Sequence, residues 1–185
     1  THLRKAPELY KQFGNTMKIK KIKIILSIFL LTIGHSIFAC DCESQGDFFK
    51  VASKTKLVAL VKITRYLTFD VIDDVKTPIS MEVEIIEIYK GKESRKKVIV
   101  WGDNGFLCRP YLSRFDEGKH YIIAFNETSS KPKKSEEIEK PMEYSISICG
   151  EYWLNIDLKK QIATGSLTKK KINFKAFKRK IKNYR

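Results

Sequence analysis

Apolar residues in the middle of the chain form either alternating patterns or short continuous runs rich in β-branched and aromatic side chains, and both are typical of β-strands. Gly91, Gly102 and Gly118 lie in the polar segments that separate these runs, where turns are expected. The pattern therefore predicts an all-β protein with five strands, which are Leu57–Phe69, Ser80–Tyr89, Lys97–Trp101, His120–Phe125 and Tyr144–Cys149.

The second of these segments changes phase halfway along its length. Met81, Val83 and Ile85 alternate with glutamates, and the apolar positions then shift by one residue to Ile86 and Ile88. A shift of one residue in a period-2 pattern indicates a β-bulge. Five strands with one of them bulged are typical of a small Greek-key barrel of the OB-fold type. A β-sandwich is an alternative that fits the same pattern of strands. Residues 127–143 are polar and mixed in charge, and they are predicted to form the tip of a hairpin.

The C-terminal segment, residues 159–185, differs from the rest in charge. It holds 11 basic and no acidic residues, whereas residues 40–158 hold 18 basic and 20 acidic ones. Phe174, Phe177, Ile181 and Tyr184 follow helical spacing and predict an amphipathic C-terminal helix. One interpretation is a helix that packs on the domain and leaves its lysines in solvent. The other is contact with an anionic surface or another polyanion, such as lipid or glycan.

The segment from Met17 to Ala39 has the pattern of a secretory signal peptide. Four lysines precede an apolar run, Ile24–Ala39, which ends in a small residue. The run has 16 residues, fewer than the roughly 20 that a membrane-spanning helix needs, so we expect no transmembrane helix in the mature form. We predict that residues 17–39 are a signal peptide and that the protein is secreted, extracellular or periplasmic. Residues 1–16, which precede Met17, are expected to be an extension that is not native. We expect no nucleic-acid partner for an exported protein.

Four cysteines remain after this predicted cleavage, namely Cys40, Cys42, Cys108 and Cys149. An even number of cysteines in an exported chain predicts two disulfides. A bond between Cys40 and Cys42 would close a strained one-residue loop, so each is expected to pair with a distant cysteine. A structural zinc site is the alternative, although the spacing lacks paired C-x-x-C motifs.

Several separated motifs in residues 40–158 resemble one known family. The mature chain would open with Cys40-Asp41-Cys42. The motif Glu87–Gly91 (EIYKG) would end one strand and Gly118–Ala124 (GKHYIIA) would begin another; Cys108 lies between these motifs and Cys149 after them, where partners of the two leading cysteines are expected. In these features the chain resembles the N-terminal, inhibitory domain of the tissue inhibitors of metalloproteinases (TIMP), which belong to the netrin-like OB-fold group. The resemblance implies disulfides Cys40–Cys108 and Cys42–Cys149, and no cofactor of the protein's own.

The resemblance also implies a function. In that family the α-amine and the backbone carbonyl of the first cysteine chelate the catalytic zinc of a target metalloprotease. Here that cysteine would be Cys40, binding the zinc in trans. The Asp41 side chain would enter the pocket beside the zinc, and Cys42, Glu43 and Ser44 would complete the inhibitory ridge.

The chain departs from the family at Asp41, where a small hydroxylated residue is usual. Burying an unpaired carboxylate in an apolar pocket costs several kcal/mol. The target's pocket is therefore cationic or polar, or the protein does not inhibit this class of protease.

Two alternatives remain for the N-terminus and for the activity. Ile37–Cys40 partly resembles a bacterial lipobox, in which case Cys40 would be acylated and the protein would be a lipid-anchored, non-inhibitory binding module. Enzymatic activity is not expected, since His120 is the only histidine after residue 39 and no catalytic triad can be assembled around it. The acidic pairs Asp73-Asp74 and Glu136-Glu137 lie in loop-like segments and are expected to be solvated.

Overall fold

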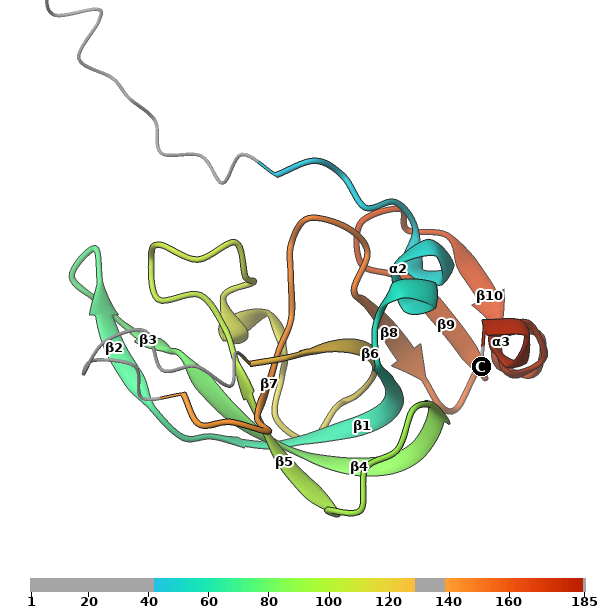
Figure 1. Cartoon of the computed structure of the whole chain (residues 1–185), viewed down its shortest axis with the longest axis horizontal. Coiled ribbons are helices and arrows are strands. Elements are labelled where there is room, and N and C mark those ends of the chain that lie inside the picture. Colours follow the sequence, from blue (N-terminus) through green and yellow to red (C-terminus); the bar gives the residue numbers. More distant parts are fainter. Residues whose placement is uncertain (1–41, 129–138, 185) are drawn as a thin grey trace, which may run out of the picture. The chain divides into compact units, whose positions relative to one another are not determined.

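The computed structural model describes residues 42–128 and 139–184. Within them, five strands close into a barrel in the order β1-β4-β5-β7-β6, with β6 pairing back onto β1 (Figure 1). All neighbours are antiparallel except β5 and β7, which are parallel. The closed ring confirms the predicted all-β barrel and rules out the sandwich. Its strands are β1 (Leu57–Tyr66), β4 (Ser80–Lys90), β5 (Lys97–Trp101), β6 (His120–Glu127) and β7 (Tyr144–Ser145).

The predicted bulge lies in β4. Leu60 of β1 faces Glu87, and the next residue, Val61, faces Ile85, so that Ile86 has no partner in the ladder. Ile86 is 49% exposed, while Met81 and Val83 on the inward face are fully buried. The extra residue shifts the inward positions by one and helps this long strand bend around the barrel.

The first predicted strand is shorter than the pattern suggested. β1 ends at Tyr66, and the chain continues into a separate two-stranded hairpin, β2 (Phe69–Ile72) and β3 (Val75–Pro78). Asp73 and Asp74 form its two-residue turn with φ values of 49° and 62°. Positive φ at both positions is the geometry that matches the twist of the two strands. Both aspartates are exposed to solvent, as predicted for a loop-like segment, and their structural role is to form this turn.

A short helix that the pattern did not predict precedes the barrel. Helix α2 (Phe48–Lys54) begins after Asp47, whose carboxylate accepts a hydrogen bond of 3.1 Å from the backbone N–H of Lys50. This is an N-cap, which satisfies one of the free N–H groups of the first turn. Phe48, Val51 and Ala52 are buried in the core.

Beyond the barrel the sheet continues from the edge of β6. The added strands are β8 (Trp153–Asp157), β9 (Ile162–Gly165) and β10 (Lys171–Asn173), joined by antiparallel pairing. β9 and β10 lie within the basic segment, where the sequence pattern predicted only a helix. The expected helix follows as α3 (Phe174–Ile181) and ends in η2, a 3-10 turn at Lys182–Tyr184.

Helix α3 packs on the domain through its apolar face. Phe174, Phe177 and Ile181 are buried, as their helical spacing predicted. The Phe177 ring lies 5.8 Å from that of Phe48 and 5.3 Å from that of Tyr89, so the helix packs against both α2 and β4. No helix within the described ranges has the length and apolar character to cross a bilayer.

Candidate functional site

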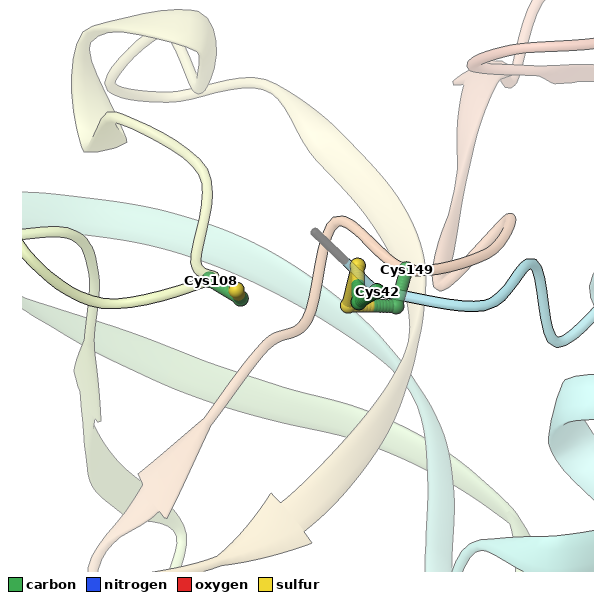
Figure 2. Close-up of side chains that lie close together, drawn as sticks. All are labelled: Cys42, Cys108 and Cys149. Carbon is green, nitrogen blue, oxygen red and sulfur yellow. A yellow bond between two sulfur atoms is a disulfide. The ribbon is translucent and has the colours of Figure 1, made fainter. Parts of the chain in front are cut away.

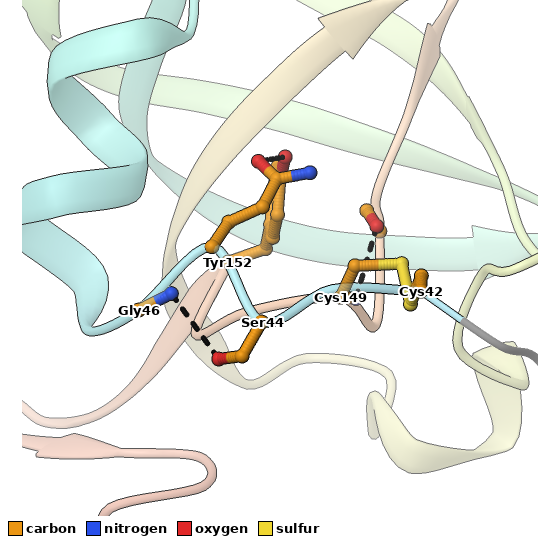
Figure 3. The surroundings of a disulfide bond; sticks show 7 residues. Cys42, Ser44, Gly46, Cys149 and Tyr152 are labelled. Carbon is orange, nitrogen blue, oxygen red and sulfur yellow. Dashed lines mark hydrogen bonds between the residues drawn. A yellow bond between two sulfur atoms is a disulfide. The ribbon is translucent and has the colours of Figure 1, made fainter.

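One disulfide anchors the N-terminal end of the described chain. Cys42 is bonded to Cys149, with a Cα–Cα distance of 5.6 Å and a sequence separation of 107 (Figure 3). Cys149 follows the short strand β7, where a longer strand, Tyr144–Cys149, was predicted. The chain leaves the sheet after Ser145, and this departure brings Cys149 within reach of Cys42.

Backbone hydrogen bonds hold the residues that follow Cys42 against the same loop. The N–H of Gln45 donates to the carbonyl of Cys149 at 2.6 Å, and the N–H of Glu151 donates to the carbonyl of Gly46 at 3.0 Å. The Tyr152 hydroxyl adds a bond of 2.8 Å to the side-chain oxygen of Gln45. Residues 42–46 are therefore tied to residues 149–152 by a disulfide and three hydrogen bonds.

The close approach of these two segments requires a glycine at position 150. A Cβ atom added there would lie 2.9 Å from a methyl group of Val51 and 3.2 Å from the Cβ of Gln45. Any larger residue would push the Cys149 loop away from the start of α2. Gly150 thus allows the chain after Cys149 to approach Gln45 and Val51 closely.

Cys108 lies beside this disulfide. The Sγ atoms of Cys42, Cys108 and Cys149 lie within 4.8 Å of one another (Figure 2). Such a cluster of sulfurs can bind a metal as thiolates, but Cys42 and Cys149 are oxidised to a disulfide. Cys108 is also disulfide-bonded. The partner that the resemblance implies for it, Cys40, lies outside the described residues.

The loop that carries Cys108 is held by its own side chains. The Asp103 carboxylate accepts hydrogen bonds from the backbone N–H of Gly105 at 3.1 Å and of Leu107 at 2.9 Å. Asn104 accepts one from the N–H of Phe106 at 3.3 Å. These bonds order a loop whose tip, Phe106, is 94% exposed.

Exposed apolar side chains lie on the two loops that carry Cys108 and Cys149 and on the β2–β3 hairpin next to the Cys108 loop. Ile148 donates its N–H to the carbonyl of Cys108 at 3.1 Å, which places it next to the Cys108 loop. On the other side of this loop, a Cβ atom added to Gly105 would lie 3.4 Å from the Ile72 methyl group, so the β2–β3 hairpin is adjacent. We call these exposed residues the apolar rim: Phe69, Val71, Val75, Phe106, Leu107 and Ile148.

The predicted ridge is only partly within the described residues. Cys40 and Asp41 lie outside them, as does the predicted signal peptide. Cys42 is half-buried, and Glu43 and Ser44 are exposed beside it. The Ser44 hydroxyl accepts a hydrogen bond of 3.3 Å from the N–H of Gly46, which closes a turn before α2 (Figure 3).

The apolar rim was missed by the sequence analysis. Phe106 and Leu107 directly precede Cys108 in a segment with turn residues, and Ile148 directly precedes Cys149 at the end of the predicted strand Tyr144–Cys149. Apolar residues next to cysteines in a turn-rich segment are a sequence feature from which exposed apolar side chains at this position could have been predicted.

His120 and Glu93, the carboxylate with the largest pKa shift among the described residues, do not belong to the cysteine cluster. His120 is on β6 opposite Lys62, and burial lowers its pKa. Glu93 accepts hydrogen bonds from the Arg95 guanidinium and from the Tyr144 hydroxyl, and the Arg95 bonds lower the pKa of Glu93 to about 2. This group joins the β4–β5 turn to β7.

No protein-family model matches this chain, and comparison with curated proteins gives no match either.

Proposed function

We propose that this protein is an exported metalloprotease inhibitor-like protein that binds the active-site zinc of its target through the amine and carbonyl of Cys40. The proposal rests on the resemblance of the sequence to the inhibitory domain of the TIMP family. The structural observation that carries it is the anchoring of residues 42–46 by the Cys42–Cys149 disulfide and by hydrogen bonds to residues 149–152.

Anchoring matters because chelation demands a fixed geometry. An amine and a carbonyl from one residue bind zinc only if both are held toward the metal, and ordering a flexible terminus would weaken binding. A catalytic zinc keeps one coordination position open for water, which the incoming ligand takes. An α-amine with a pKa near 8 loses its proton to the metal at modest cost. A residue two positions before a disulfide-bonded Cys42 suits this role.

The apolar rim supports a protein partner. Isolated exposed apolar side chains are common, but here Phe106, Leu107 and Ile148 lie within two residues of Cys108 or Cys149, and the other three lie on the hairpin next to the Cys108 loop. Aromatic side chains often provide most of the affinity at the centre of an interface. Phe106, at the tip of an ordered loop, is the side chain best placed to enter a pocket of the partner.

Asp41 restricts the class of target. Its carboxylate would enter the pocket beside the zinc, and a charge is tolerated there only if the pocket supplies a cation or hydrogen-bond donors. The proposed target is therefore a zinc metalloprotease with a polar or cationic specificity pocket.

The experiment compares two one-residue extensions of the mature protein. An alanine added before Cys40 moves the free amine away from the chelating position, so inhibition of a sensitive zinc protease should weaken at least roughly 100-fold, about 2.7 kcal/mol. An alanine added after Arg185 is the matched control and should change nothing. Both variants should unfold at the temperature of the parent. Equal potency of the two extended proteins would contradict zinc chelation by Cys40.

A second candidate function is an exported or lipid-anchored binding module without inhibitory activity. The apolar rim favours it, because a surface of this kind binds a protein without any zinc. Here Phe106→Ala should weaken partner binding while the extension before Cys40 has no effect. Intact-mass measurement of the exported protein separates an acylated Cys40 from a free amine and so decides between the anchored and the soluble forms.

A further inference from the structure

The β8–β9 turn, β10 and α3 together present a basic surface. Lys175, Lys178, Arg179 and Lys182 line one side of α3 and, with Asn173, surround a hollow of about 530 Å³. Their spacing of three and four residues puts them on one face of the helix, opposite the buried Phe177. This face is held in place because α3 is docked on the domain.

Neighbouring strands add further cations to this side. Side chains alternate along a strand, so Lys171 lies on the same face of β10 as Asn173, which lines the hollow. The backbone N–H of Phe174 donates to the carbonyl of Gln161 at 2.9 Å, which places the β8–β9 turn, with Lys159, beside the start of α3. We define the basic face as Lys159, Lys171, Lys175, Arg179 and Lys182.

The cations of the basic face are not neutralised by acidic side chains in the part of the chain that the structure describes. None of its five residues forms an ion pair with another residue in the described ranges. The carboxylates bordering it are paired with other lysines, since Asp157 pairs with Lys160 and Glu87 with Lys178. The sequence holds no acidic residue from 159 to 185. Five cations on one surface repel one another, and an anionic partner would relieve this repulsion.

An exposed leucine lies at the edge of the same surface. Leu158 is 39% exposed in the β8–β9 turn, directly before Lys159 and Lys160. An apolar side chain next to several lysines suits the boundary between lipid headgroups and acyl chains, where both kinds of side chain find favourable surroundings. A polysulfated glycan would use the cations alone.

The composition of the basic face also favours a bilayer. Four of its five cations are lysines, which act as hydrated point charges, whereas arginine supplies the planar fork that recognises single sulfate or phosphate groups. Lysines are suited to a diffuse layer of headgroup charge, in which each cation near the surface contributes about 1 kcal/mol.

From these features we infer that the basic face binds the surface of a bilayer that contains anionic phospholipid. Lys175 and Arg179 of α3 and Lys182 of η2 lie over the headgroups, and Leu158 inserts at the edge. This inference is independent of zinc chelation by Cys40 and goes beyond the proposed function.

The test is co-sedimentation of the exported, processed protein with two kinds of vesicle. One kind is phosphatidylcholine alone, and the other contains about 30% phosphatidylglycerol. The parent should bind only the anionic vesicles and should dissociate at about 500 mM sodium chloride, where exposed charges are screened. The triple variant Lys175→Gln, Arg179→Gln, Lys182→Gln should bind these vesicles roughly 100-fold more weakly.

The control variant carries Lys54→Gln, Lys92→Gln and Arg114→Gln, which are exposed positions outside the basic face. It has the same change in net charge and the same numbers of lysines and arginines removed, so it should bind within about 3-fold of the parent. Equal losses in both triple variants would show that net charge alone is responsible and would overturn the inference. Equal binding to both vesicle types would overturn it too, as would binding to heparin without binding to vesicles.

Discussion

Replacing Phe177 by alanine tests whether α3 is fixed on the domain. The Phe177 side chain is 0% exposed and lies among four other rings. Its centroid is 5.8 Å from that of Phe48, 5.6 Å from Phe49, 5.3 Å from Tyr89 and 6.3 Å from Phe174. Removing the ring opens a cavity between α3, α2 and β4.

The expected cost follows from this burial. A buried phenylalanine removes roughly 150–250 Å² from water, worth about 4 to 6 kcal/mol at about 25 cal/mol per Å². Alanine retains part of that area, while the cavity adds a penalty, and measured Phe→Ala costs in cores are about 3–5 kcal/mol. We expect a loss of about 4 kcal/mol. At an m-value of about 2 kcal/mol/M, the urea midpoint then falls by about 2 M.

The assay is equilibrium urea unfolding followed by circular dichroism under non-reducing conditions. Phe106→Ala is the matched control, because it deletes the same ring at a position that is 94% exposed. It should change the free energy of unfolding by less than about 0.5 kcal/mol. A cost below about 1 kcal/mol for Phe177→Ala would refute the docking of α3 through its aromatic face, and the basic face could then not be treated as a fixed surface.

Two further predictions concern the disulfide and the buried carboxylate. The double variant Cys42→Ser, Cys149→Ser should lose about 4–5 kcal/mol of stability, because the bond closes a loop across a separation of 107 residues; a loss under about 1 kcal/mol in non-reducing urea unfolding would contradict this. Glu93→Gln should cost about 2 kcal/mol at pH 7. The pKa of Glu93 is lowered from 4.5 to about 2, so this contribution is present above pH 4.5 and is lost as the pH falls toward 2. The parent and the variant should therefore converge in stability near pH 2, and a difference that does not depend on pH would contradict the role of the ionised carboxylate.

The sequence by itself determined the elements whose periodicity is long and clear. The inward positions Met81 and Val83 of β4 and the presence of a one-residue shift followed from the alternation of apolar residues with glutamates, because a strand presents alternate side chains to opposite faces. Ile86, which the shifted pattern placed with the apolar positions, is instead the exposed bulge residue. The buried face of α3 followed from the helical spacing of Phe174, Phe177 and Ile181. The closed barrel was one of two predicted architectures.

Local pattern was insufficient where elements were short or irregular. Helix α2 has 7 residues and depends on the cap at Asp47 and on packing of Phe48 against α3. Isolated helices this short are unstable, so tertiary contacts decide that they form. Strand β7 keeps two residues of a longer predicted strand, since the chain must leave the sheet to carry Cys149. The strands β9 and β10 were not predicted, because the high lysine content of their segment leaves no clear alternation of apolar and polar residues.

For the candidate site, the sequence determined the positions of the cysteines and predicted their export, and only the tertiary structure decided what lies around them. Spacing could not show that the Cys108 loop with Phe106 lies between Ile148 and the β2–β3 hairpin, because these three segments are far apart in the chain. It likewise could not show that the charges of Lys171, Lys175 and Arg179 lie on one rigid face. Barrel closure and the docking of α3 make such groups neighbours, and both depend on contacts between residues far apart in the chain.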